Sequence, residues 1–132
     1  MKLTFDTNIL ISSSLWYNSV AYKLLIRLIK EDAEIFTTLE ILDEYVKILK
    51  RDFRYNDNEI KSVLNNLLSF LKIVKPLERF DIIKEDMGNN KILECAYFSN
   101  SNFILTYDKH LLKLKGFRNI KIITPEEFLR LI

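Results

Sequence analysis

The stretch of sequence that decides the fold is KLTFDTN, at residues 2–8. Its first four residues, Lys2–Phe5, form a short run of apolar and β-favouring side chains of the kind found in buried strands. Asp6 follows this run directly, and a second run of the same kind, Phe103–Thr106, is followed closely by Asp108. In an open parallel sheet, functional residues gather beyond the carboxyl ends of the strands. The sequence therefore predicts that Asp6 and Asp108 lie at the same edge of one sheet.

Strands and helices alternate along the rest of the chain. Further strands are predicted over Glu34–Thr37, Leu71–Val74 and Ile120–Ile123, and helices over Ile9–Leu15, Val20–Lys30, Thr38–Lys50, Asn58–Phe70, Asn90–Asn100 and Lys109–Leu114. A last helix begins after Thr124, because Pro125 and Glu127 complete its start signal. The helix at Asn58–Phe70 is expected to pair with the preceding one as a hairpin. This alternation predicts an α/β fold of three layers, with helices flanking a mainly parallel sheet of four or five strands.

The composition is that of one globular domain over residues 1–132. Hydrophobic residues make up 48% and charged residues 29% of the chain, which argues against disorder, and no linker or repeat divides it. A single cysteine excludes an internal disulfide and favours a reducing compartment. The chain opens without a signal peptide, and no apolar run reaches the roughly 18 residues of a membrane span. We expect a cytoplasmic protein that does not enter a membrane.

Residue counts exclude several classes of site. The two glycines, Gly88 and Gly116, lie far apart, which excludes a glycine-rich phosphate loop. One cysteine and one histidine cannot form a four-ligand zinc site, and His110 has no nucleophile motif beside it. The net charge of +2 is too small to indicate a polyanionic partner by itself. Carboxylates remain, and two that converge repel each other unless a cation such as a hard divalent ion compensates them.

Four segments and the end of the chain carry a family pattern. They are FDTNIL at 5–10, TTLEILDE at 37–44, DMGNNKILECA at 86–96, ILTYDKHLL at 104–112 and IITPEEFL at 122–129. Together they resemble the PIN-domain family, and within it the small VapC-like toxins, which are metal-dependent ribonucleases. One segment alone is weak evidence, because Asp-Thr-Asn is common. The order and spacing of the whole set make the resemblance specific.

The resemblance implies a reaction, a set of residues and partners. It implies the toxin component of a type II toxin–antitoxin pair, an endoribonuclease that uses Mg²⁺ or Mn²⁺. The catalytic positions that match the family's acids are Asp6, Glu44, Asn89 and Asp108, and the implied metal ligands are Asp6, Glu44 and Asp108. The implied partners are the RNA substrate, an antitoxin protein and a second copy of the chain in a homodimer.

The sequence departs from the family pattern at Asn89, where the family has an aspartate. An asparagine offers a neutral carbonyl oxygen, so the site loses one negative charge. The change is compatible with compensation by Asp86, with an inactivating substitution and with natural decay of the site. The alternative function is therefore a catalytically inactive PIN-fold protein that binds RNA or an antitoxin. Lesser departures are Tyr107 in place of a glycine and His110 in place of an aspartate.

Each candidate residue also has a purely structural interpretation. Asp6, Asn89 and Asp108 are good helix-capping residues. From its place on the helix, Glu44 is expected to be a solvated acid, and only the family pattern favours a role in the site. The residues expected beside the metal ligands are Thr7, Asn8, Asp86 and His110. Thr7 and Asn8 are expected to orient Asp6 and to cap the helix that follows it.

A dense basic stretch follows Glu44 and contains two aromatic residues, Phe53 and Tyr55. The residues expected to bind RNA are Lys47, Lys50, Arg51, Arg54, Lys91 and Lys109. Cations of this kind contact the phosphate backbone, and aromatic rings stack on unpaired bases. The alternative is a solvated helix face.

Two large aromatic residues, Trp16 and Tyr17, follow the first helical segment. Exposed aromatic clusters mark interfaces. We therefore predict a homodimer, with an apolar groove in each protomer that accepts an amphipathic helix. The alternative is that Trp16 packs into its own core.

Overall fold

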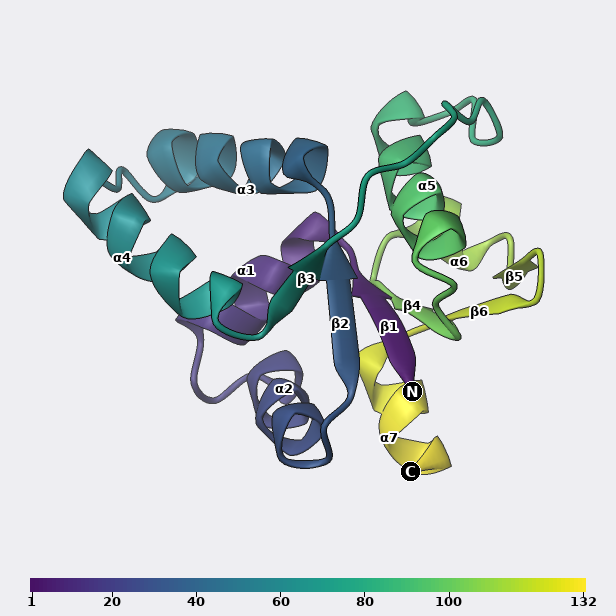
Figure 1. Ribbon diagram of the computed structural model, residues 1–132, viewed down its shortest axis with the longest axis horizontal. Helices are drawn as coiled ribbons and strands as arrows, with labels where there is room; N and C mark the ends of the chain where they lie inside the picture. The colour runs from purple at the N-terminus through teal and green to yellow at the C-terminus, as the bar shows by residue number, and fades with distance from the viewer.

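A sheet of six strands runs through the middle of the computed structural model, which describes residues 1–132 (Figure 1). The strands are β1 (Lys2–Phe5), β2 (Glu34–Thr37), β3 (Leu71–Ile73), β4 (Phe103–Leu105), β5 (Gly116–Phe117) and β6 (Ile120–Ile123). Their order is β3-β2-β1-β4-β6-β5, and every pair is parallel except β5 with β6. The predicted α/β fold with a mainly parallel sheet is confirmed.

The sixth strand corrects the expected number of four or five. β5 is two residues long and pairs with β6 across a tight turn. Arg118 and Asn119 adopt positive φ angles of 48° and 70° in that turn. Positive φ at both central residues is the geometry of a hairpin turn that matches strand twist, for which asparagine is well suited. A run of two residues is too short for a hydrophobic pattern to reveal.

Seven helices surround the sheet. They are α1 (Thr7–Leu15), α2 (Val20–Lys30), α3 (Leu39–Asp52), α4 (Asp57–Leu68), α5 (Asn90–Phe98), α6 (Lys109–Leu112) and α7 (Pro125–Leu131), with a 3₁₀ turn, η1 (Met87–Asn89), before α5. The start signal of α7 is confirmed, since Thr124 and Glu127 form a capping box ahead of Pro125 at the first helical position. The expected hairpin of α3 and α4 is wrong: the two helices diverge from their shared turn, and α4 leads back to β3 (Figure 1).

Packing places one core of 29 buried apolar residues around the sheet. Helix α5 lies against β1, β2 and β4, and α2 packs on α1 and α7. Cys95 of α5 is buried, and its pKa is raised to about 12 because burial disfavours the thiolate. None of the helices has the length and apolar character needed to cross a bilayer.

Residues 74–86 link β3 to η1, and we call this segment the strap. Asn90 holds it: its side-chain oxygen accepts the backbone N–H groups of Ile82 (3.0 Å) and Ile83 (2.9 Å), and its nitrogen donates to the carbonyls of Ile83 and Met87. Glu94, one turn further along α5, accepts the N–H of Phe80 at 2.9 Å. These hydrogen bonds fix the position of the strap relative to the start of α5.

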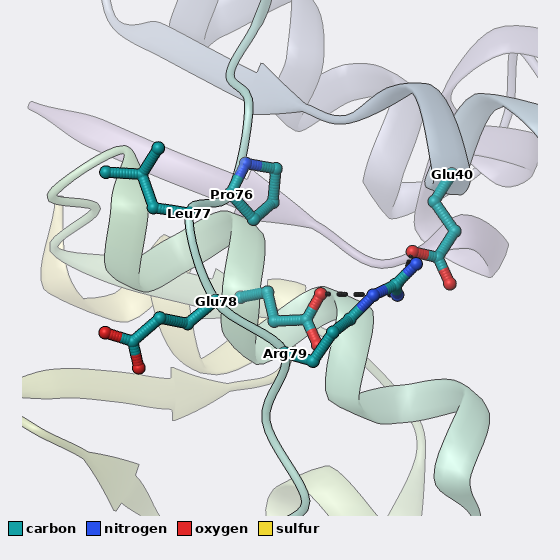
Figure 2. A pocket seen from close by; sticks show the side chains of 6 residues that line it. Glu40, Pro76, Leu77, Glu78 and Arg79 are labelled. Atoms are coloured by element: carbon teal, nitrogen blue, oxygen red, sulfur yellow. Dashed lines mark hydrogen bonds and ion pairs between the residues drawn. The ribbon is translucent and has the colours of Figure 1, made fainter.

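An ion-pair bridge fastens the strap from outside. Arg79 reaches between Glu40 of α3 and Glu94 of α5, in a pocket whose rim includes Pro76 and Leu77 (Figure 2). Its guanidinium hydrogen-bonds Glu40 and lies 3.7 Å from Glu94. Glu94 is almost fully buried, whereas Arg79 is largely exposed. The bridge ties two helices and the strap together close to the carboxyl edge of the sheet.

Candidate active site

A polar cavity of about 130 Å³ opens at the carboxyl ends of the central strands. Its lining residues are Asp6, Thr7, Asn8, Glu44, Ile48, Asp86, Gly88, Asn89, Ile92 and Asp108. All four residues predicted to be catalytic lie in this set, although they come from segments up to about a hundred positions apart. Parallel pairing of β1 with β2 and β4 brings these segments to one edge. We call this cavity the cleft.

Asp6 is both a helix cap and a buried acid. Its residue exposure is 4%, and its carboxylate accepts the N–H of Ile9 at 2.8 Å and the hydroxyl of Thr106. Burial raises the pKa of Asp6 to about 6, and the negative charges of Asp108 and Glu44 raise it further against the lowering effect of the two hydrogen bonds. The structural and functional interpretations of Asp6 therefore coexist.

Asp108 caps helix α6, because its carboxylate accepts the N–H of His110 at 2.8 Å. Thr106 connects it to Asp6: the Thr106 hydroxyl donates to Asp6 and accepts the N–H of Asp108 at 2.9 Å. Thr106 was not among the predicted site residues. The signal that could have found it is its place at the end of a predicted strand, two residues before Asp108.

Glu44 projects from α3 and is held by two donors. The Thr7 hydroxyl hydrogen-bonds one carboxylate oxygen, and Nζ of Lys91 lies 3.1 Å from the other. Thr7 thus positions Glu44, whereas the sequence predicted that it would orient Asp6. Lys91, predicted to contact RNA, is buried at 8% exposure in this ion pair.

Asn89 lines the cleft, and its side chain makes no hydrogen bond. It precedes α5, but its side chain makes no capping bond, and its buried Nδ2 has no partner. Asp86 stands exposed at the mouth of the cleft, and Asn8 is exposed as well. His110 lies outside the cleft lining. The neighbouring residue Asn90, which was not among the predicted site residues, is the asparagine with a structural role, because its side chain hydrogen-bonds the backbone of the strap.

The side chains that line the cleft are of the kind that bind hard divalent ions. Their donor groups are carboxylate and amide oxygens, which suit Mg²⁺ and Mn²⁺. The raised pKa of Asp6 indicates that the protein itself leaves the charge of this carboxylate uncompensated. As they stand, no three Asp, Glu, His or Cys side chains are grouped closely enough to hold an ion together. The donor atoms of the cleft therefore suit a divalent ion, and in this structure the carboxylates of Asp6 and Glu44 accept hydrogen bonds from the protein.

A second polar cavity, of about 350 Å³, adjoins the cleft and shares Glu44 and Ile48 with it. Its lining holds the three cations Lys47, Arg51 and Lys91 together with three acids, Glu40, Asp43 and Glu44. The other residues expected to bind RNA, Lys50, Arg54 and Lys109, line neither cavity. Lys50 instead lies 3.5 Å from Asp57 of α4.

An apolar cavity of about 410 Å³ opens between α1, α2 and α4, with Tyr17, Tyr22 and Ile26 in its lining. Tyr17 is 70% exposed and meets Tyr22 edge-on, with 5.0 Å between ring centroids. Trp16 is half exposed and touches Phe53 at its edge. Trp16 is therefore not part of the buried core.

Comparison with known proteins agrees with this architecture. The family model described as PIN domain matches residues 2–110. The uncharacterized protein MJ1680 of Methanocaldococcus jannaschii is 29% identical, over 98% of this chain and 90% of that protein. Among solved structures, a chain of VapBC2 from Rickettsia felis, bound to a DNA fragment from its promoter, is similar with a TM-score of 0.64. That likeness covers 92% of this chain and 97% of the other at 17% identity, and it concerns the fold.

Proposed function

The chain belongs to the PIN domain family, and from this premise we propose that it is a metal-dependent endoribonuclease, the toxin component of a toxin–antitoxin pair. One observation carries the proposal. Three acids from distant segments, Asp6, Glu44 and Asp108, line one small cleft at the carboxyl edge of a parallel sheet. Such a concentration of negative charge is unfavourable unless a cation joins it.

The residues of the cleft have distinct roles in this proposal. Asp6, Glu44 and Asp108 would hold Mg²⁺ or Mn²⁺, with Asn89 offering a neutral oxygen beside them. A bound ion of this kind lowers the pKa of a water molecule and stabilises the charge on the leaving oxygen of a phosphodiester. Thr106 holds Asp6, and Thr7 and Lys91 hold Glu44, so that the acids are positioned before substrate arrives.

The substrate follows from the cavity beside the cleft. Lys47 and Arg51 lie along it, within reach of a chain that enters the cleft, and cations in such a place neutralise phosphates without reading sequence. A single strand suits the narrow cleft better than a duplex, because its backbone bends to present one phosphodiester. We therefore assign single-stranded RNA as the substrate class.

The apolar cavity between α1, α2 and α4 supplies a place for the antitoxin. Its aromatic and aliphatic lining suits the apolar face of an amphipathic helix. Trp16 and Tyr17 stand exposed beside it and extend the apolar surface available to an antitoxin or to a second copy of the chain. The VapBC2 structure offers a fold-level analogy for such a pairing.

A second candidate function is favoured by two observations. Asn89 removes one charge from the cleft, and no three acids are grouped for metal binding. Both suit a PIN-fold protein that binds RNA or an antitoxin without cleaving RNA. In that case the second polar cavity and the apolar cavity keep their roles, and the cleft has lost its catalytic role.

The experiment is cleavage of a fluorescent single-stranded RNA with Mn²⁺ by the wild type, Asn89→Asp and Asp6→Asn. We expect Asn89→Asp to cleave at least about tenfold faster than the wild type, because it adds a charged oxygen ligand, and Asp6→Asn to be inactive. Mn²⁺ should raise the Tm of Asn89→Asp more than that of the wild type. If neither the wild type nor Asn89→Asp cleaves the RNA, and Mn²⁺ changes the Tm of neither protein, the chain is not a nuclease.

A further inference from the structure

Lys91 is the one lysine of the chain that is removed from water. Its residue exposure is 8%, although an unpaired ammonium is costly to bury. Its partners are Oε2 of Glu44, at 3.1 Å, and the carbonyl oxygen of Gly88 in η1. The ammonium therefore lies between α3 and the start of α5, in the lining of the second polar cavity, and it contacts the cleft through Glu44, which lines both cavities.

These contacts also decide where the carboxylate of Glu44 lies. The Glu44 side chain is 41% exposed, so burial alone does not fix it. One of its oxygens is bonded to Thr7 and the other to Lys91. A divalent ion bound directly at the second oxygen would lie beside the ammonium and be repelled by it.

The charges of the cleft are unevenly distributed. Asp6, Glu44 and Asp108 carry three negative charges, and Lys91 adds one positive charge. The remaining two negative charges are neutralised by one divalent ion. The positive charge lies at Glu44, and Asn89 adds no negative charge on the same side. Asp6 and Asp108 take part in no ion pair, whereas Glu44 does. Asp86 stays exposed to water at the mouth, where screening weakens its effect.

We propose that Lys91 is a positioning residue that takes the place of a second cation at Oε2 of Glu44, so that the cleft accepts one divalent ion, which Asp6, Asp108 and the other oxygen of Glu44 would hold. The inference rests on the proposed function, because it states how many metal ions that site takes. It also explains why Lys91 is buried instead of reaching out to RNA: its charge is used in the ion pair with Glu44.

Calorimetric titration of the full chain with Mn²⁺ tests this role. The wild type should take up one ion, and Lys91→Met, which keeps the length of the side chain without its charge, should take up two. Lys91→Arg retains the charge and should return to one. Lys109→Met is the matched control, since exposed Lys109 neighbours Asp108 without touching Glu44, and its affinity for the first ion should stay within about twofold of the wild type.

The outcomes separate this inference from the proposed function. Two ions on the wild type, or one ion on Lys91→Met with unchanged affinity, overturns the role of Lys91 and leaves a metal-dependent site in place. No uptake by any of these proteins overturns both. Circular dichroism checks the fold of each variant, and Lys91→Gln, with the same expectation of two ions, replaces Lys91→Met if the latter does not fold.

Discussion

Two neighbouring asparagines, Asn89 at the end of η1 and Asn90 at the start of α5, have opposite surroundings. Asn90 is 3% exposed, and both ends of its amide are hydrogen-bonded to the backbone of the strap and η1. Asn89, one residue earlier, makes no side-chain hydrogen bond, and its buried nitrogen faces the cleft without a partner. Buried polar groups are almost always paired, so an unpaired one requires an explanation.

The same contrast extends beyond the asparagines. On the strap side of α5, Glu94 is buried and accepts a backbone N–H, with Arg79 as its cation. On the cleft side, Asp6 is as buried as Glu94 but has acids for neighbours and a raised pKa. Polar groups on the strap side are satisfied by the protein and stabilise it. Under the proposed function, Asp6 and Asn89 in the cleft are left for a ligand, at a cost to stability.

The largest effect should come from replacing the strap-side asparagine. Asn90→Ala leaves the N–H groups of Ile82 and Ile83 without an acceptor, and we expect it to lower the free energy of unfolding by about 3 kcal/mol. Asn89→Ala, the matched control, removes no hydrogen bond and should change it by less than about 0.5 kcal/mol. Urea denaturation measures both. Equal losses would show that the two asparagines are structurally equivalent.

A smaller effect of opposite sign is expected in the cleft. Because the pKa of Asp6 is about 6 in the folded protein and 3.8 ordinarily, the native state holds a proton at pH 4–6 that the unfolded chain has released. The stability of the wild type therefore falls as pH rises through that window. Asp6→Asn should be more stable than the wild type by about 1–3 kcal/mol at pH 7.5 without metal.

Thermal unfolding of Asp6→Asn and the wild type across pH 3.5 to 7.5 measures this difference. The gap should close below about pH 4, where Asp6 is protonated in both states. Asn8→Ala, an exposed neighbour in the cleft lining, should show no such pH dependence. A gap that is constant with pH would mean that the ionisation of Asp6 is not its cause.

The smallest effect concerns the bridge that fastens the strap. Arg79→Ala should lower the free energy of unfolding by only about 0.5 kcal/mol, because its pair with Glu40 is exposed and the buried Glu94 keeps its hydrogen bond from the N–H of Phe80. Hydrogen exchange of the Phe80 amide should nevertheless become faster, since Arg79 joins the strap to both α3 and α5. Lys84→Ala removes an exposed pair within the strap itself, with Asp81, and should leave that exchange rate unchanged. Equal exchange rates of the Phe80 amide in the two variants would show that the ion-pair bridge does not hold the strap in place.

The sequence predicted most of the fold because its signals are local. Short β-favouring runs marked the five parallel strands, and capping residues such as Thr124 marked helix starts. The two-residue β5 escaped, because no periodicity exists over so short a run. The α3–α4 hairpin was wrong because the angle between consecutive helices depends on their tertiary packing, which no local pattern encodes.

The site was predictable to a lesser depth. The position of Asp6 and Asp108 at strand ends followed from a general rule, whereas Glu44 entered through the family resemblance alone. The contacts of Thr7 and Lys91 with Glu44 could not be derived, because they depend on how α3 and α5 approach each other across the cleft. The predicted contacts of Lys47 and Arg51 with RNA stay predictions.

The pairing of β1 with β4 has a consequence for how the protein is made. Thr106 and Asp108 lie about a hundred residues after Asp6, and β4 must insert beside β1 before the hydroxyl of Thr106 reaches Asp6. Such long-range pairings form slowly and only once both strands are available. During synthesis the first strand, α3 and the start of α5 leave the ribosome ahead of Asp108, so a nascent chain carries an incomplete cleft. Under the proposed function, the chain would therefore be unable to cleave its own messenger until nearly the whole chain has been translated.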